Sequence, residues 1–166
     1  MAVKVFSGSP YTHVAAVVIE EGQPIVYDSM NGAGVRKQSL ADYIRSAAPD
    51  ELHVLQPKFR YSSKLSKPYT AHLREEIGRP YAVKHHLTGD RCEGVHCAEY
   101  VTDALMASDI IRAKNPPKVS PASLLEGITK ASLYRESLTL NLDIPPPPRK
   151  VGDTWCERLW LDTKYC

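Results

Sequence analysis

The strongest helical pattern in the chain begins at a cysteine. Residues 97–111 (CAEYVTDALMASDII) carry small and apolar side chains at the spacing of an α-helix face. The face consists of Ala98, Val101, Ala104, Leu105 and Ser108. A thiol at the first position of a helix meets the positive end of the helix dipole, which lowers its pKa. Cys97 is therefore either a nucleophile or a buried structural cysteine.

The remaining pattern predicts an α+β domain. Two β-branched runs, 13–19 (HVAAVVI) and 24–29 (PIVYDS), predict a β-hairpin around a glycine-containing turn. Further strands are expected over 52–55 and within 133–142, and segment 56–67 is expected to be a loop. The expected helices are 40–47 with Ser39 as N-cap, 68–77 ended by Gly78, and 122–126 with Ser120 as N-cap, Pro121 at the first position and Gly127 as the stop.

The hairpin brings a histidine and an aspartate together. If Glu21 and Gly22 form the centre of the turn, Ala15 pairs with Asp28, and His13 lies diagonal to Asp28 on the same face, roughly 7–8 Å away. His13 can then exchange a proton with a thiol while Asp28 orients the imidazole. The alternatives are a strand-end histidine without a role and a solvent-facing aspartate, and a register slip of one residue would separate the two.

Charge and hydropathy exclude several classes of protein. Lys and Arg total 21 and Asp and Glu 19 in 166 residues, a net charge of +2, whereas a nucleic-acid-binding domain usually carries a basic stripe. No stretch approaches the ~20 apolar residues that span a bilayer. The first ten residues do not read as a signal peptide, so a cytoplasmic protein without nucleic acid or a transmembrane segment is expected.

The cysteines and histidines near residue 97 raise the question of zinc. Cys92, His96 and Cys97 are close in sequence, but a structural zinc site needs four ligands, and Cys156 and Cys166 are far away. We therefore expect no metal and no cofactor. The neighbouring residues are given lesser roles: His85 and His86 are expected to be solvated, Cys92 to be a bystander, and Glu99 to face away from the thiol.

Several motifs occur in the order found in a known family. The chain resembles the circularly permuted, YiiX-like branch of the NlpC-type papain-like cysteine peptidases. The matching segments are Thr12–Val17 (THVAAV), Tyr27–Ser29 (YDS), Gly34–Val35 with Leu40 and Tyr43, Gly78–Tyr81 (GRPY), His96–Val101 (HCAEYV) and Ser120–Leu124 (SPASL). They cover residues 12 to 124, and residues 133–166 lie outside the resemblance.

The resemblance implies a site and a fold. It makes Cys97 the nucleophile, His13 the base and Asp28 the orienting residue, where the family often has glutamate. Tyr81 would line the site near the oxyanion, and His96 is a second candidate for contact with the substrate, although it is also a less favoured candidate for the base. The implied fold over 1–143 is an antiparallel sheet or barrel packed against the helix that carries the nucleophile.

The function implied is thiol-dependent cleavage of an amide bond in a peptide, a peptidoglycan stem or a lipid conjugate. The same residues would also serve an acyltransferase or thioesterase. A third interpretation is a binding module in which the site is unused. In that case residues 144–166, a proline spacer followed by a tail with Trp155 and Trp160, would bind a partner or a second copy of the chain.

Overall fold

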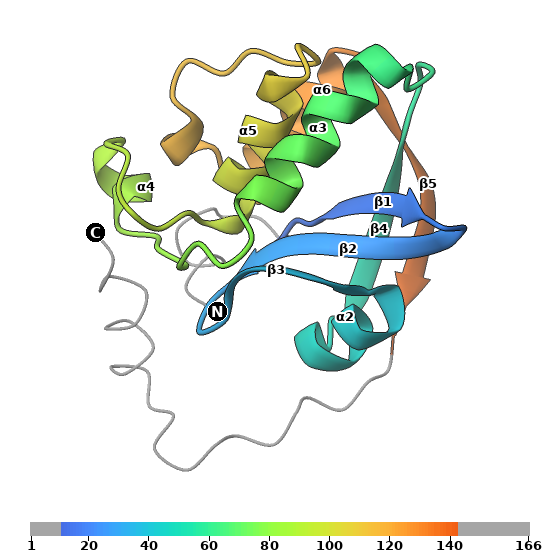
Figure 1. The fold of residues 1–166 in the computed structure, drawn as a ribbon, viewed down its shortest axis with the longest axis horizontal. Coiled ribbons are helices and arrows are strands. Elements are labelled where there is room, and N and C mark those ends of the chain that lie inside the picture. Colours follow the sequence, from blue (N-terminus) through green and yellow to red (C-terminus); the bar gives the residue numbers. More distant parts are fainter. Residues whose placement is uncertain (1–10, 143–166) are drawn as a thin grey trace.

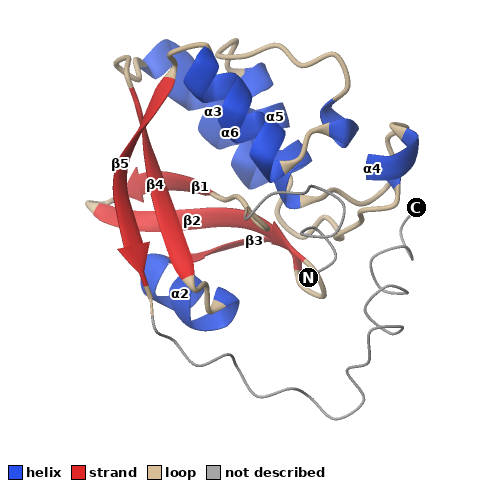
Figure 2. Cartoon of the chain, turned by 180° about the vertical axis from the view of Figure 1, so that it is seen from behind, coloured by secondary structure: helices blue, strands red, loops and turns tan. Residues whose placement is uncertain are grey.

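Within residues 11–142, the strands form two antiparallel sheets that do not close into a barrel. In the computed structural model, which describes residues 11–142, one sheet has the order β1-β2-β3 (Ala16–Glu20, Gln23–Met30, Gly34–Ser39) and the other pairs β4 with β5 (Glu51–Pro57, Tyr134–Asn141). The α+β class is therefore confirmed and the barrel is wrong. No pairing joins the two sheets within residues 11–142, because β4 pairs with the late strand β5 instead of extending the first sheet. The β4–β5 pair runs across the direction of the three-stranded sheet (Figures 1 and 2).

The predicted hairpin register is confirmed. Ala16 pairs with Tyr27 and Glu20 with Gln23, which places Glu21 and Gly22 in the turn. Both turn residues have positive φ, 50° and 78°, as a tight two-residue hairpin turn requires. The strand itself is shorter than predicted: β1 begins at Ala16, so His13 lies just before it.

Helices cover both faces of the three-stranded sheet. Figure 1 shows α3, α5 and α6 on one side and α2 on the other. The helical elements are α2 (Leu40–Ala47), α3 (Ser63–Glu75), α4 (His85–Thr88), α5 (Cys97–Ala107), the 3-10 turn η1 (Pro116–Lys118) and α6 (Pro121–Lys130). No helix within residues 11–142 is long and apolar enough to cross a membrane.

Capping residues were predicted better than helix ends. Ser39, a predicted N-cap, accepts a hydrogen bond from the Asp42 amide at the start of α2. Ser120, the other predicted N-cap, forms a capping box with Ser123 at the start of α6. The predicted stop at Gly127 is wrong, because α6 continues to Lys130. A glycine inside a helix costs about 1 kcal/mol, which packing can offset.

Two other helix boundaries differ from the prediction. α3 begins at Ser63, so most of the expected loop 56–67 is strand or helix, and Pro68 lies inside the helix. α5 ends at Ala107 rather than Ile111, because the chain adopts a positive φ at Asp109. The predicted spacer and tail, 144–166, lie outside the described residues.

The hydrophobic core surrounds α5. Tyr100, Ala104 and Leu105 of this helix are at most 2% exposed. The Tyr100 hydroxyl donates a 2.6 Å hydrogen bond to the Leu73 carbonyl of α3, so even the polar end of this buried ring is satisfied. The core continues into the sheet through Tyr27. The helix that begins at Cys97 is thus held on both sides, which fixes the position of its first residue.

Candidate active site

Cys97 occupies the first position of α5 and is 2% exposed. The preceding residue, His96, is the N-cap, and its ring accepts a hydrogen bond from the Glu99 amide at 3.4 Å. The Ser29 hydroxyl of β2 donates to the Val95 carbonyl at 2.7 Å and ties the approach to the helix to the sheet. The thiol therefore lies at the positive end of a firmly held helix, where the first amide N–H groups have no partner within the helix.

His13 is held by a buried carboxylate. Its Nε2 lies 3.2 Å from Oδ2 of Asp28, whose side chain is 0% exposed. The same carboxylate accepts hydrogen bonds from Arg36 of β3, from Nε at 2.9 Å and from Nη2 at 3.2 Å. Tyr43 of α2 stacks against the imidazole with 6.2 Å between ring centres. The predicted contact between His13 and Asp28 is confirmed, and it leaves Nδ1 as the nitrogen that can exchange a proton with another group.

The Cys97 thiol and the His13 imidazole shift each other's pKa. Burial alone would raise the pKa of Cys97, but the charge of His13 and hydrogen bonds to His13 and His96 overcome it and lower the pKa to about 5. Burial alone would lower the pKa of His13, but the charge of Cys97 and hydrogen bonds to Asp28 and Cys97 raise it to about 9. Because each charge favours the other, the two groups titrate as a pair. Between these values the pair exists as thiolate and imidazolium.

Asp28 remains ionised beneath this pair. Burial opposes its ionisation, but hydrogen bonds to His13 and Arg36 and the charges of both groups hold the pKa of Asp28 below its ordinary value. An ionised carboxylate can both orient the ring and stabilise its positive charge. The three predicted catalytic residues are therefore brought together by the hairpin and the start of α5.

The two predicted substrate-binding residues have different surroundings. His96 is 4% exposed, and its Nε2 lies 2.8 Å from the Pro117 carbonyl, so its ring braces the start of α5 in this structure. Tyr81 is partly exposed in the segment before α4, next to Pro80, whose carbonyl accepts a hydrogen bond from Val95. Contact of either residue with a substrate stays a prediction.

Arg36 and Tyr43 were missed by the sequence reading. Arg36 escaped because no strand was predicted over residues 34–39, although the pairing of β2 with β3 places Arg36 opposite Asp28. The sequence does contain a pattern that predicts this contact. A short glycine-containing turn follows the strand of Asp28, and Arg36 comes after the turn at the spacing that places it opposite Asp28 in a hairpin. Tyr43 was quoted only as part of a motif.

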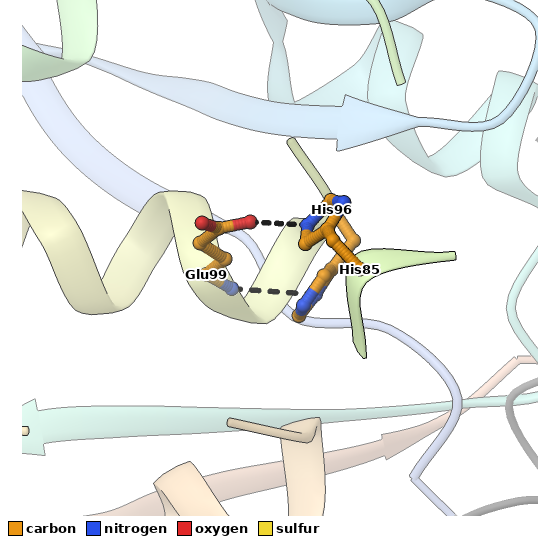
Figure 3. A group of neighbouring side chains, drawn as sticks. All are labelled: His85, His96 and Glu99. Carbon is orange, nitrogen blue, oxygen red and sulfur yellow. Dashed lines mark hydrogen bonds and ion pairs between the residues drawn. The ribbon is translucent and has the colours of Figure 1, made fainter. Parts of the chain in front are cut away.

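A second buried cluster lies between α4 and the first turn of α5. Figure 3 shows His85 of α4, His96 and Glu99 pointing toward one another, and their ligand atoms all lie within 4.8 Å. The expectation of a solvated His85 is wrong: the residue is 2% exposed, and its Nε2 lies 2.5 Å from Oε2 of Glu99. Glu99 does turn away from Cys97, but into this cluster rather than into solvent. These three residues are the group within 11–142 that could hold a metal ion.

Comparisons with known proteins identify no relative. No family model matches the chain, and no curated protein or solved structure matches it either. The resemblance to permuted NlpC-type peptidases stays a prediction. A function for the site must therefore be inferred from the geometry of Cys97, His13 and Asp28.

Proposed function

We propose that the protein is a thiol hydrolase that cleaves an amide bond, with Cys97 as the nucleophile, His13 as the proton carrier and Asp28 as the residue that orients the imidazole. One observation carries the proposal: a cysteine at the first position of a helix in the core has its pKa lowered by a histidine whose Nε2 is held by a fully buried carboxylate. This combination of nucleophile, base and orienting group is typical of acyl transfer to a thiol.

The chemistry follows from these positions. The Cys97 thiolate attacks the carbonyl carbon of the substrate, and the charge that develops on the oxygen is stabilised by amide N–H groups of the first turn of α5. The proton on Nδ1 of His13 passes to the leaving amine as the carbon–nitrogen bond breaks. Water then attacks the thioester, gives a proton to His13 and releases the acid, and the thiolate re-forms.

Arg36 has a supporting role in this scheme. Its two hydrogen bonds fix the Asp28 carboxylate in one orientation, and the ring of Tyr43 stacks on the imidazole. A ring held at two points loses little further entropy when the substrate binds. Arg36 is therefore a positioning residue, which acts through Asp28.

We also propose that the chain has a permuted papain-like fold. In support, the strand that follows the base precedes the helix of the nucleophile in the chain, with β1 at Ala16–Glu20 and α5 at Cys97–Ala107. That is the order of the permuted family that the sequence resembles.

Acyl transfer to a second substrate is the closest alternative. It shares the first half of the reaction and differs only in the group that attacks the thioester. Cys97 is only 2% exposed. A site that excludes water slows hydrolysis of the thioester, which favours transfer to a second substrate.

Trapping the covalent intermediate tests the proposal. The full chain would be incubated with a panel of peptide amides, acyl-lipid amides and thioesters, and the protein mass would be followed with and without added amines. We expect a transient acyl adduct on Cys97 that is absent in Cys97→Ala, with Cys92→Ser as the matched control that retains it. An adduct that turns over only with an added amine would favour transfer. Failure to form any adduct across the panel would favour the binding module.

A further inference from the structure

The buried cluster between α4 and the first turn of α5 has the composition of a metal site. Two imidazoles and one carboxylate, from His85, His96 and Glu99, are each no more than 4% exposed and place their ligand atoms within 4.8 Å of one another. Buried ionisable groups are rare unless they are paired or bind metal. The cluster joins α4 to the start of α5, so it connects segments that are otherwise linked by a loop (Figure 3).

Each of the three side chains is held from behind. The Nε2 of His96 lies 2.8 Å from the Pro117 carbonyl, and the Nδ1 of His85 lies 2.9 Å from the Cys92 sulfur. Arg91 donates a 3.3 Å hydrogen bond to Oε1 of Glu99. Metal-binding histidines usually donate their second ring N–H to a carbonyl or a similar partner, and ligating carboxylates are hydrogen-bonded in turn. These contacts leave Nε2 of His85 and Oε2 of Glu99 facing each other inside the cluster. The Nδ1 of His96 also faces inward, where it accepts the 3.4 Å hydrogen bond from the Glu99 amide that a bound ion would replace.

The distances decide whether an ion fits. Zinc bound at about 2.0–2.1 Å in a tetrahedron sets its donor atoms roughly 3.4 Å apart. The two ligand atoms that lie farthest apart, at up to 4.8 Å, would have to approach each other by about 1.4 Å to reach this spacing. The nitrogen of His85 and the oxygen of Glu99, now 2.5 Å apart, would have to separate by about 1 Å. Rotation about side-chain bonds supplies movements of this size. The rings of His85 and His96 are stacked, with centres 5.2 Å apart and planes at 23°, so at least one ring must also turn for both to point at one ion.

We propose that His85, His96 and Glu99 bind one divalent transition-metal ion, with zinc as the ion best suited to two imidazoles and a carboxylate, and with a water molecule as its fourth ligand. The ion takes the place of the hydrogen between His85 and Glu99, and the ring of His85 then carries its hydrogen on Nδ1, toward the Cys92 sulfur. Bound there, it fastens α4 to the first turn of α5 in exchange for the cap hydrogen bond between His96 and the Glu99 amide. The proposal does not require Cys97 to be a nucleophile, although His96 also influences the Cys97 thiol.

Metal titration of the full chain tests this site. After treatment with a chelator, the wild type is expected to bind one equivalent of zinc, measured by calorimetry and by metal analysis, and its melting temperature is expected to rise with zinc concentration. Glu99→Gln and His85→Ala are expected to weaken binding more than about a hundredfold, and Cys92→Ala, which removes an outer contact, by about 10–100-fold. Glu99→Gln keeps the side-chain shape and serves if His85→Ala fails to fold.

Two controls exclude other ligands. His53→Gln removes a histidine of β4 that lies outside the cluster, and the Cys156→Ser/Cys166→Ser double variant removes the two cysteines of the C-terminal tail; both are expected to bind zinc like the wild type. Cobalt in place of zinc is expected to show no sulfur-to-cobalt charge-transfer band, because Cys92 contacts the outer nitrogen of His85. Absence of stoichiometric zinc binding, unchanged binding in Glu99→Gln, loss of binding in the cysteine double variant, or a sulfur band would each overturn the assignment. Zinc binding is also measured in Cys97→Ala, which lacks the proposed nucleophile. Zinc bound by this variant would show that the metal site does not depend on the hydrolase proposal.

Discussion

Replacing Asp28 by asparagine removes one charge from the centre of the site while its volume is kept. The carboxylate is 0% exposed and has two partners, His13 at 3.2 Å and Arg36 at 2.9 and 3.2 Å. Breaking a buried ion pair by removing one partner costs about 3–5 kcal/mol. The amide oxygen of asparagine still accepts one hydrogen bond from Arg36. The Arg36 side chain is also partly exposed, so water can solvate its charge after the carboxylate is removed. We therefore expect the free energy of unfolding to fall by about 2–3 kcal/mol at neutral pH.

The pH dependence separates charge from shape. Because the folded protein holds the pKa of Asp28 below its ordinary value, the stabilisation from its charge is fully present above the unfolded pKa, about 3.9, and is lost as the pH falls through the folded pKa. The free energies of unfolding of wild type and Asp28→Asn should therefore differ most at neutral pH and converge in acid. Asp28→Asn should also lower the pKa of His13, because the hydrogen bond and charge of Asp28 help to raise it.

Urea unfolding from neutral pH down to about pH 3 measures the difference, and NMR titration of the His13 ring reports its pKa. Asp50→Asn, an exposed aspartate between α2 and β4, is the matched control and should leave the unfolding midpoint unchanged. An Asp28→Asn protein as stable as the wild type at neutral pH would refute the reasoning. So would a stability difference that stays constant as the pH falls, since that would assign the effect to packing rather than to charge.

Three further perturbations test the supporting structure. Gly34→Ala places a Cβ 2.5 Å from a backbone oxygen at a positive φ, and should destabilise the fold by about 1–3 kcal/mol in urea unfolding, clearly more than Gly32→Ala, which meets no atom within 4 Å. Ser120→Ala removes the capping box of α6 and should cost about 1 kcal/mol, whereas Ser120→Asp should retain most of it. Glu20, whose pKa is lowered to about 2 chiefly by a hydrogen bond from Lys37, should contribute stability that is lost between about pH 4.5 and pH 2 in thermal unfolding, and Glu20→Gln should abolish that part of the pH dependence.

The contact between His13 and Asp28 and the position of Cys97 could be predicted from local rules. The turn chemistry of Glu21 and Gly22 fixed the hairpin register, and the register alone put His13 beside Asp28. Cys97 could be placed because a helix start is a local signal. These features depend on neighbours in the chain, which a single sequence contains.

The parts that could not be predicted depend on contacts between distant segments. His85 lies in a polar stretch that reads as solvated, and only the fold brings it to Glu99, fourteen residues further along the chain. α3 begins earlier than expected because tertiary packing outweighs the penalty for Pro68 inside the helix. β3 was missed because its six residues, GVRKQS, are mostly polar, and its pairing with β2 supplies the stability that its own composition lacks.

The rate at which iodoacetamide labels Cys97, followed against pH by peptide mapping in the presence of a chelator, tests the central claim most directly. The account predicts that labelling begins near pH 5, where the thiolate forms, and that His13→Ala moves this onset to the ordinary thiol range, near pH 8.5 or above. A wild-type onset already near pH 8.5, or an onset that His13→Ala leaves in place, would contradict the thiolate–imidazolium pair on which the proposed enzyme depends.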